Sequence, residues 1–122
     1  MKRSFEQSNQ NNVIHPLILA TYINNIEMVQ NELTKISTDP ESDRIKAKAL
    51  LIASLKGHTG AAKALLDDKA NVNVANSHGM SALMLACANG HTTTVKLLLN
   101  DNADINLVNI HNKDAIMIAE EN

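Results

Sequence analysis

The feature that most constrains the fold of this chain is an internal repeat with a period of about 33 residues. A period of this length predicts a solenoid, because one short unit cannot bury its apolar face alone and needs stacked neighbours. Three motifs recur at this step: Gly57-His58 as Gly90-His91, Leu65-Leu66 as Leu98-Leu99, and Ala70-Asn71-Val72-Asn73 as Ala103-Asp104-Ile105-Asn106.

The clearest unit reads as two short helices. Ser81 can cap a first helix that continues to Asn89, and Gly90 ends it. A second helix over residues 92–100 carries apolar residues at i, i+3 and i+4, the spacing of one helical face. Asn102 then stands at the turn, and we expect it to adopt the left-handed conformation there.

The third unit reads HGMSALMLACANGHTTTVKLLLNDNADIN, from His78 to Asn106. It resembles the ankyrin repeat, whose pattern is T-P-L-H-x-A-A, then G-H, then V-x-x-L-L, then G-A-D-V-N. The segment from Leu50 to Asn73 resembles it nearly as well, and His15–Leu33 keeps the proline, leucine and alanine of the pattern. The resemblance implies an all-α ankyrin-repeat solenoid of stacked helix–turn–helix pairs joined by short hairpin loops.

The repeat sets the expected domain boundaries. Residues 1–12 are polar and offer only Phe5 for burial, so we expect a disordered and dispensable tail. Residues 13–122 form the expected ankyrin-repeat domain, with units at about 13–38, 39–75, 76–108 and 109–122.

Two units depart from the family pattern. Lys46 occupies the place of the turn glycine, and Asp39-Pro40 suggests an N-cap followed by proline at the first helical position. We therefore expect a helix of about four turns that ends at Gly57. The last unit keeps only a first helix, so that either the sequence is cut there or its polar end, Glu120-Glu121-Asn122, forms a short cap.

Composition excludes several classes of function. The formal charge is −2 and the pI is near 6.2, which argues against a nucleic-acid partner. The apolar runs are too short to span a membrane, and the polar N-terminus lacks the apolar segment of a secretory signal. With one cysteine, Cys87, no internal disulfide can form. We expect a cytoplasmic protein, or one delivered into a host cell if the source is an intracellular bacterium.

The chemically reactive side chains are expected to be structural. The resemblance implies that His58 and His91 make hydrogen bonds between loops. Cys87 lies between two alanines, where we expect a buried and inert thiol. His78 and His111 recur at hairpin tips, too far apart to share a zinc ion. We therefore expect no catalytic residues, no cofactor and no metal.

The function that the resemblance implies is protein–protein recognition by a rigid concave surface, without catalysis. We expect the apolar members of the contact set to form a cluster on an otherwise polar surface: Ile45, Leu55, Met80 and Ile110. The full contact set that the resemblance implies is Arg44, Ile45, Ala47, Leu55, Lys56, Ser77, His78, Met80, Ala88, Asn89, Ile110, His111 and Lys113.

Two alternatives remain open at this point. The last unit could leave Ile116 and Ile118 partly bare, so that a second copy covers them and the chain is a self-associating assembly subunit. The chain could also be a regulatory fragment of a larger enzyme or a secreted effector. We expect a monomer or weak homodimer whose partner is another protein.

Overall fold

The computed structural model describes residues 14–121, and the predicted tail at 1–12 lies outside them. No strand forms within residues 14–121, and the hairpin expected near residue 78 is reduced to a single bridge between Ala75 and Ser81. The all-α prediction is confirmed. The helices are α2 (Pro16–Tyr22), α3 (Ile26–Lys35), α4 (Ser42–Lys56), α5 (Thr59–Asp67), α6 (Ala82–Ala88), α7 (Thr92–Asn100) and α8 (Ala115–Glu121).

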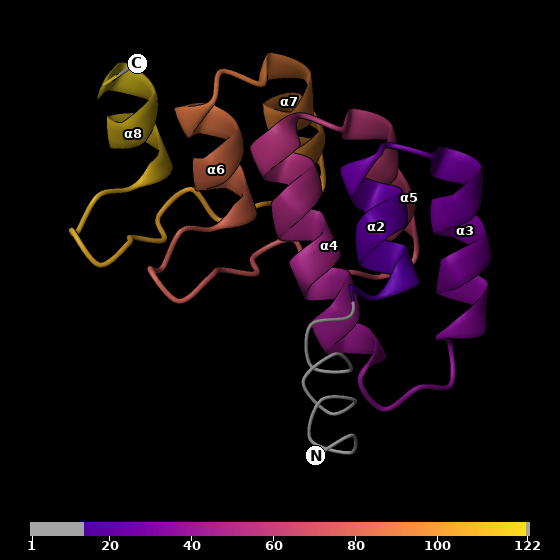
Figure 1. The fold of residues 1–122 in the computed structure, drawn as a ribbon. Coiled ribbons are helices and arrows are strands. Elements are labelled where there is room, and N and C mark those ends of the chain that lie inside the picture. Colours follow the sequence, from indigo (N-terminus) through magenta and orange to yellow (C-terminus); the bar gives the residue numbers. More distant parts are fainter. Residues whose placement is uncertain (1–13, 122) are drawn as a thin grey trace, which may run out of the picture.

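The helices form two stacked rows (Figure 1). An inner row consists of α2, α4, α6 and α8, and each member packs against the next. An outer row consists of α3, α5 and α7, which also contact one another in sequence and pack against the inner helices. Equivalent positions of successive units, one repeat period apart in the sequence, are therefore brought side by side along each row.

One position ends the first helix of three successive units. Gly57 and Gly90 have φ angles of 74° and 69°, and Asn24 takes the same place with a φ of 57°. Asparagine is one of the few residues that visit this left-handed region at modest cost. Asn24 thus adopts the left-handed conformation that glycine adopts in the other two units, which explains how the first unit can end its helix without a glycine. The expected left-handed Asn102 is also confirmed, with a φ of 66°.

The long helix α4 begins later than expected. Its first residue is Ser42, preceded by Glu41, and the predicted N-cap Asp39 lies in a turn before it. The Asp39 carbonyl accepts a hydrogen bond from the Ser42 amide at 3.0 Å, and its carboxylate accepts one from the Glu41 amide at 2.8 Å. Pro40 is part of this tight turn, so the helix starts two residues after it. The length of 15 residues agrees with the four turns expected.

The core is a continuous aliphatic stripe between the two rows. Leu17, Leu50 and Leu83 occupy one repeated position and are 0%, 0% and 3% exposed. Buried alanines on the inner helices let these helices approach closely, which explains how a chain with only two aromatic residues can pack a core.

Loops of neighbouring units are also joined. The Asn73 side chain accepts a hydrogen bond from the Asp104 amide at 2.7 Å. Within the second unit, Lys46, buried in α4, donates to the Asp68 carbonyl at 2.8 Å and lies 3.1 Å from the Asp68 carboxylate, which ties α4 to the end of α5. One contact thus joins two units and the other joins two helices of one unit, so the solenoid presents its loops at defined places.

Candidate functional site

A row of side chains crosses the C-terminal ends of the inner helices. Tyr22, Leu55 and Ala88 occupy one repeated position, and Lys56 and Asn89 the next. Tyr22 is 52% exposed and Leu55 43%, Lys56 and Asn89 are exposed, and Ala88 is half-buried. The Lys56 Nζ atom lies 4.6 Å from the centre of the Tyr22 ring, which shows that residues of neighbouring units meet along this row. We call these five residues the inner-face row.

Two histidines form hydrogen bonds with backbone carbonyls at or beside residues of the inner-face row. The His91 Nε2 atom lies 2.9 Å from the carbonyl oxygen of Leu55, and the His58 Nδ1 atom lies 3.0 Å from that of Thr21. Because a carbonyl oxygen only accepts hydrogen bonds, each of these ring nitrogens carries the proton. Both histidines join neighbouring units by hydrogen bonds, but their acceptors lie in the last turns of α2 and α4 and not in loops as expected. Each bond stabilises the backbone at or beside a row residue.

Loop tips form the second part of the predicted contact set. Ser77, His78, Ile110 and His111 are exposed, and the Ile110 amide donates to the His78 carbonyl at 3.0 Å. Each tip also contains an asparagine turn, since the Asn76 side chain accepts from the His78 amide at 2.9 Å and the Asn109 side chain from the His111 amide at 2.8 Å. We call these four exposed residues the loop tips. The hydrogen bonds just described stabilise the backbone that carries their side chains.

The predicted apolar cluster is only partly correct. Leu55 and Ile110 are exposed, at 43% and 62%, but Ile45 and Met80 are half-buried against the core. The Met80 sulfur also accepts a hydrogen bond from the side-chain Nδ2 of Asn109 at 3.3 Å. Packing therefore covers more of both side chains than expected.

The predicted residues of the second unit do not lie in a hairpin. Arg44, Ile45 and Ala47 belong to the first turns of α4, and Arg44 pairs with Glu41 at 3.1 Å on the same turn. The family pattern places a loop here, but the helix starts before these residues and takes them into regular structure. In the last unit, Lys113 pairs with Glu121 at the end of α8.

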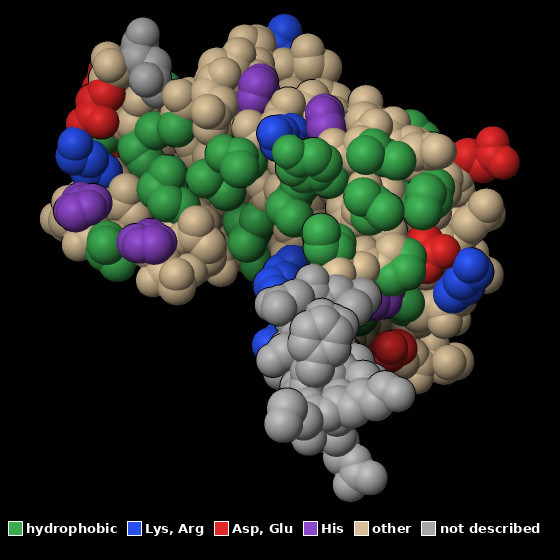
Figure 2. Space-filling model, viewed as in Figure 1, with side chains coloured by type: hydrophobic (Ala, Val, Ile, Leu, Met, Phe, Trp, Pro, Cys, Tyr) green, Lys and Arg blue, Asp and Glu red, His purple; other side chains and the backbone are tan. Residues whose placement is uncertain are grey.

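Sequence reasoning missed the apolar character of the first unit. Leu19, Tyr22 and Ile23 are 42%, 52% and 54% exposed, so the surface is less polar than expected. Figure 2 shows hydrophobic side chains in a band across the face formed by the inner helices. The signal was available, because Tyr22 lies one repeat period before Leu55. The first unit lacks the glycine-histidine pair that marks this position in the other units, which hides the correspondence.

The exposed face of α8 was predicted correctly for one residue and wrongly for another. Ile116 is 54% exposed, as expected, whereas Ile118 is 6% exposed. Since α8 packs against α6, a residue two positions along the helix turns toward that neighbour and is buried.

Cys87 is half-buried and not fully buried as expected, and desolvation raises the pKa of its thiol. A raised pKa lowers the fraction of nucleophilic thiolate near neutral pH. Residues 14–121 contain no group of three acidic, histidine or cysteine side chains that could hold a metal ion. Within the same residues, no helix combines the length and the apolar character needed to cross a membrane.

A model of a known protein family matches the chain. Its description is ankyrin repeats (3 copies), and it covers residues 17–109, which is more than half of the sequence. A search among curated proteins finds no match.

Proposed function

Because the chain belongs to the ankyrin-repeat family, we propose that it is a protein–protein interaction module that recognises its partner through the inner-face row and the loop tips. Ankyrin repeats generally mediate binding to other proteins. The partner surface suited to this site has apolar residues that cover Leu55 and Tyr22, flanked by polar groups near Lys56 and Asn89.

The single observation that carries this proposal is the meeting of Tyr22, Leu55 and Lys56 on the exposed inner face. Aromatic, aliphatic and cationic groups side by side are the composition typical of a binding hot spot. Their backbone is held by the histidine bonds to Thr21 and Leu55, so that little conformational entropy is lost when a partner binds.

We propose that this recognition proceeds without catalysis, in the cytoplasm. His58 and His91 are engaged with carbonyl oxygens, and the one cysteine is disfavoured as a thiolate by its surroundings. A single cysteine also fits a reducing compartment.

Site-specific photocrosslinking tests the proposal before the partner is known. A photoreactive residue replaces Lys56 on the inner face or, as a matched control, the exposed Lys63 on the outer helix α5. After irradiation in cells of the source organism, we expect a discrete adduct with one other protein from position 56 and none from position 63. An adduct from position 63 alone would place the partner on the outer side and overturn the proposal.

A further inference from the structure

A stripe of charged and apolar residues runs along the exposed face of α4. Lys48, Leu51 and Leu55 are spaced by three and four residues, which places them on one side of the helix. Lys48 is exposed, Leu51 is half-buried and Leu55 is 43% exposed. Lys56 follows Leu55, and its ammonium group lies over the ring of Tyr22. We call Lys48, Leu51, Leu55 and Lys56 the α4 stripe.

The α4 stripe is exposed although α4 has neighbours on both sides. Helix α4 packs against α2 and α6 in the inner row and against α5 of the outer row (Figure 1). With these three neighbours in place, Lys48, Leu55 and Lys56 remain exposed. Since a repeat contacts only its neighbours in the stack, further repeats at either end would not cover the α4 stripe.

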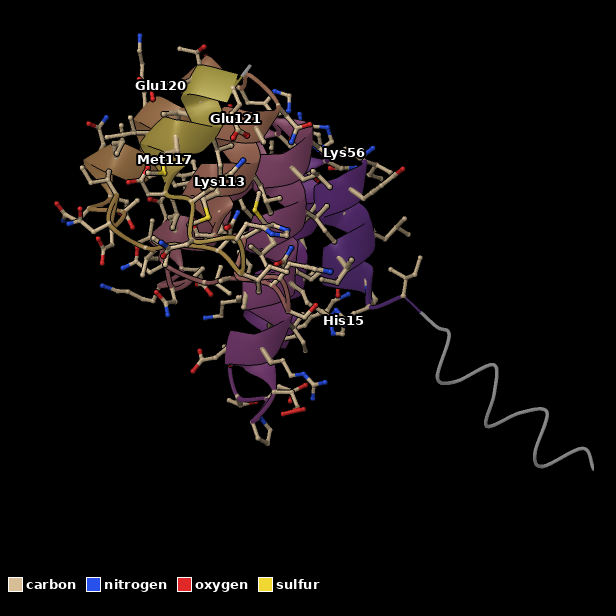
Figure 3. The ribbon with its side chains drawn as sticks, turned by 90° about the vertical axis from the view of Figure 1, so that its left-hand side faces the viewer. His15, Lys56, Lys113, Met117, Glu120 and Glu121 are labelled. Atoms are coloured by element: carbon tan, nitrogen blue, oxygen red, sulfur yellow. The ribbon has the colours of Figure 1, made fainter. Side chains whose placement is uncertain are left out.

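Positive charge gathers on the inner helices around the α4 stripe. Helices α2, α4 and α6 together carry four basic residues and one acidic residue, a formal charge of +3, although the whole chain has −2. Figure 2 shows lysine or arginine side chains beside the middle of the hydrophobic band, whereas the acidic side chains on this face lie toward its ends. Glu120 and Glu121 of α8 lie apart from Lys56 (Figure 3). The α4 stripe therefore lies in a positive part of a chain that is acidic as a whole.

Two of the four basic side chains on α4 already have carboxylate partners. Arg44 pairs with Glu41 and Lys46 pairs with Asp68, each at 3.1 Å. Within residues 14–121, the two lysines of the α4 stripe form no ion pair with a carboxylate. Their ammonium groups are thus free to pair with carboxylates of a ligand.

The spacing of these two lysines specifies the ligand further. Lys48 and Lys56 are eight residues apart in one helix, which corresponds to a rise of about 12 Å. Leu51 and Leu55 lie between them and offer apolar surface. A ligand with apolar side chains between two carboxylates at about this separation matches the stripe in charge and in polarity. A basic ligand would bring like charges together.

We propose that the inner face binds an acidic amphipathic segment of the partner protein, with carboxylates beside Lys48 and Lys56 and apolar side chains on Leu51 and Leu55. This inference rests on the proposed function and adds the chemistry of the partner. It also extends the binding surface from the inner-face row along α4 to Lys48, toward the start of the helix.

Two other ligands fit the α4 stripe less well. Helices that bind anionic membranes use clusters of about four to eight lysines or arginines, whereas the stripe offers two lysines. Residues 1–13 of the chain itself contain two basic residues and one acidic residue, so this segment does not supply a pair of carboxylates.

The probes for this site are three fluorescein-labelled peptides. The acidic peptide has the sequence Glu-Leu-Leu-Glu-Glu-Leu-Leu-Glu, and the neutral and basic peptides carry glutamine or lysine in place of every glutamate. In a helix the outer two glutamates are about 10.5 Å apart. In an extended strand, glutamates four positions apart are separated by about 13.5 Å. The acidic peptide can therefore match the two lysines in either conformation.

Fluorescence anisotropy measures the affinity of each peptide for the intact chain. At low salt we expect the acidic peptide to bind at least about fivefold more tightly than the neutral one, and the basic peptide to bind most weakly. Lys48→Glu and Lys56→Glu should each remove most of this preference. The matched control is Lys96→Glu, because Lys96 is an exposed lysine of the outer helix α7 and the substitution changes the net charge equally. This control should change the affinity less than about twofold.

Two further measurements support the comparison. Raising the salt concentration should reduce the preference for the acidic peptide, because salt screens exposed charges. Circular dichroism checks that each variant is folded, and Lys48→Gln replaces Lys48→Glu if the latter unfolds.

Four results would overturn the proposal. The first is the absence of binding of the acidic peptide up to about 1 mM, and the second is equal affinity for the three peptides. The third is equal loss of affinity in the Lys48→Glu and Lys96→Glu proteins. The fourth is binding to vesicles of phosphatidylcholine and phosphatidylserine that Lys48→Glu abolishes and the acidic peptide does not compete.

Photocrosslinking at position 56 decides the proposed function without reference to the charge of the partner. An adduct from this position, together with equal affinity for the three peptides, would reject the acidic ligand and leave recognition by the inner face intact. A loss of the adduct together with tight binding of the acidic peptide would have the opposite meaning.

Discussion

Gly57 and His91 of successive units lie so close together that a Cβ on residue 57 would be 2.5 Å from the His91 Nδ1 atom. The other nitrogen of this ring bonds to the carbonyl oxygen of Leu55, two residues before the glycine. The glycine-histidine pair is therefore an interlock between units, in which the glycine of one unit makes room for the histidine of the next.

The interlock predicts different effects at two equivalent glycines. Gly57 and Gly90 both have positive φ, but nothing lies within 4 Å of a Cβ at Gly90. Gly90→Ala should therefore cost about 1–2 kcal/mol from backbone strain alone. Gly57→Ala should cost about 1–3 kcal/mol more, because the methyl group also displaces His91.

Urea denaturation of the single mutants and of the Gly57→Ala/His91→Ala double mutant measures the cost of backbone strain and the cost of the contact with His91 separately. In the His91→Ala background, the added cost of Gly57→Ala should fall to that of Gly90→Ala. Equal costs for the two glycine substitutions in the wild-type background would show that the close contact does not contribute.

Two adjacent leucines of α7 allow the truncation of a buried side chain to be compared with that of an exposed one. Leu98 is 0% exposed and Leu99 is 43% exposed. Leu98→Ala should destabilise the fold by about 2–5 kcal/mol, because it leaves a cavity between the rows. Leu99→Ala should cost about 1 kcal/mol or less. Thermal melting followed by circular dichroism would contradict the helix-pair packing if both variants melted at the wild-type temperature.

Lys46 and Lys48 lie two residues apart on α4 and should respond differently to truncation. The Lys46 side chain is 11% exposed and contacts the main-chain carbonyl and a carboxylate oxygen of Asp68, whereas Lys48 is exposed. Lys46→Ala should cost about 1–3 kcal/mol, from the lost hydrogen bond and the lost packing of the stem. Lys48→Ala should stay within about 0.5 kcal/mol of wild type in the same urea titration.

Cys87 predicts a dependence on pH. Burial raises the pKa of its thiol above that of the unfolded chain, so the neutral form is favoured in the fold. The resulting stabilisation is present at pH values below the unfolded pKa and is lost as the pH rises through the folded value. Alkylation at pH 8 should accordingly be slower in the folded protein than in urea. A faster reaction in the folded state would mean that its surroundings activate the thiol.

Much of the fold could be predicted because it depends on local rules repeated at a fixed step. The bounds of α7, the cap at Ser81 and the left-handed Asn102 all follow from residue types with strong conformational preferences. The predicted start of α4 is two residues too early, because the main-chain carbonyl and one carboxylate oxygen of Asp39 form a tight turn before the helix. Such competition between a cap and a turn depends on the geometry of the preceding connection.

The candidate site was predicted less completely than the fold. Position in the repeat predicted that Leu55 and Ile110 are exposed, but it could not show that Ile45 and Met80 pack against the core. That outcome depends on how far α4 extends and on where Asn109 approaches from the next loop. The sequence likewise predicted that Ile116 is exposed but not that a groove of about 330 Å³ lies beside it, because most residues that line this groove come from three different helices.

The central claim, that partner recognition takes place on the inner face, is tested most directly by affinity measurements with the partner identified by crosslinking. Leu55→Glu is compared with Leu99→Glu, because both leucines are 43% exposed and lie on different surfaces, and with Lys63→Glu on the outer row. Isothermal titration calorimetry should show a loss of about 2 kcal/mol or more for Leu55→Glu in a folded protein, and little change for Lys63→Glu and Leu99→Glu. Unchanged affinity for Leu55→Glu, together with a marked loss for either of the other two variants, would contradict it.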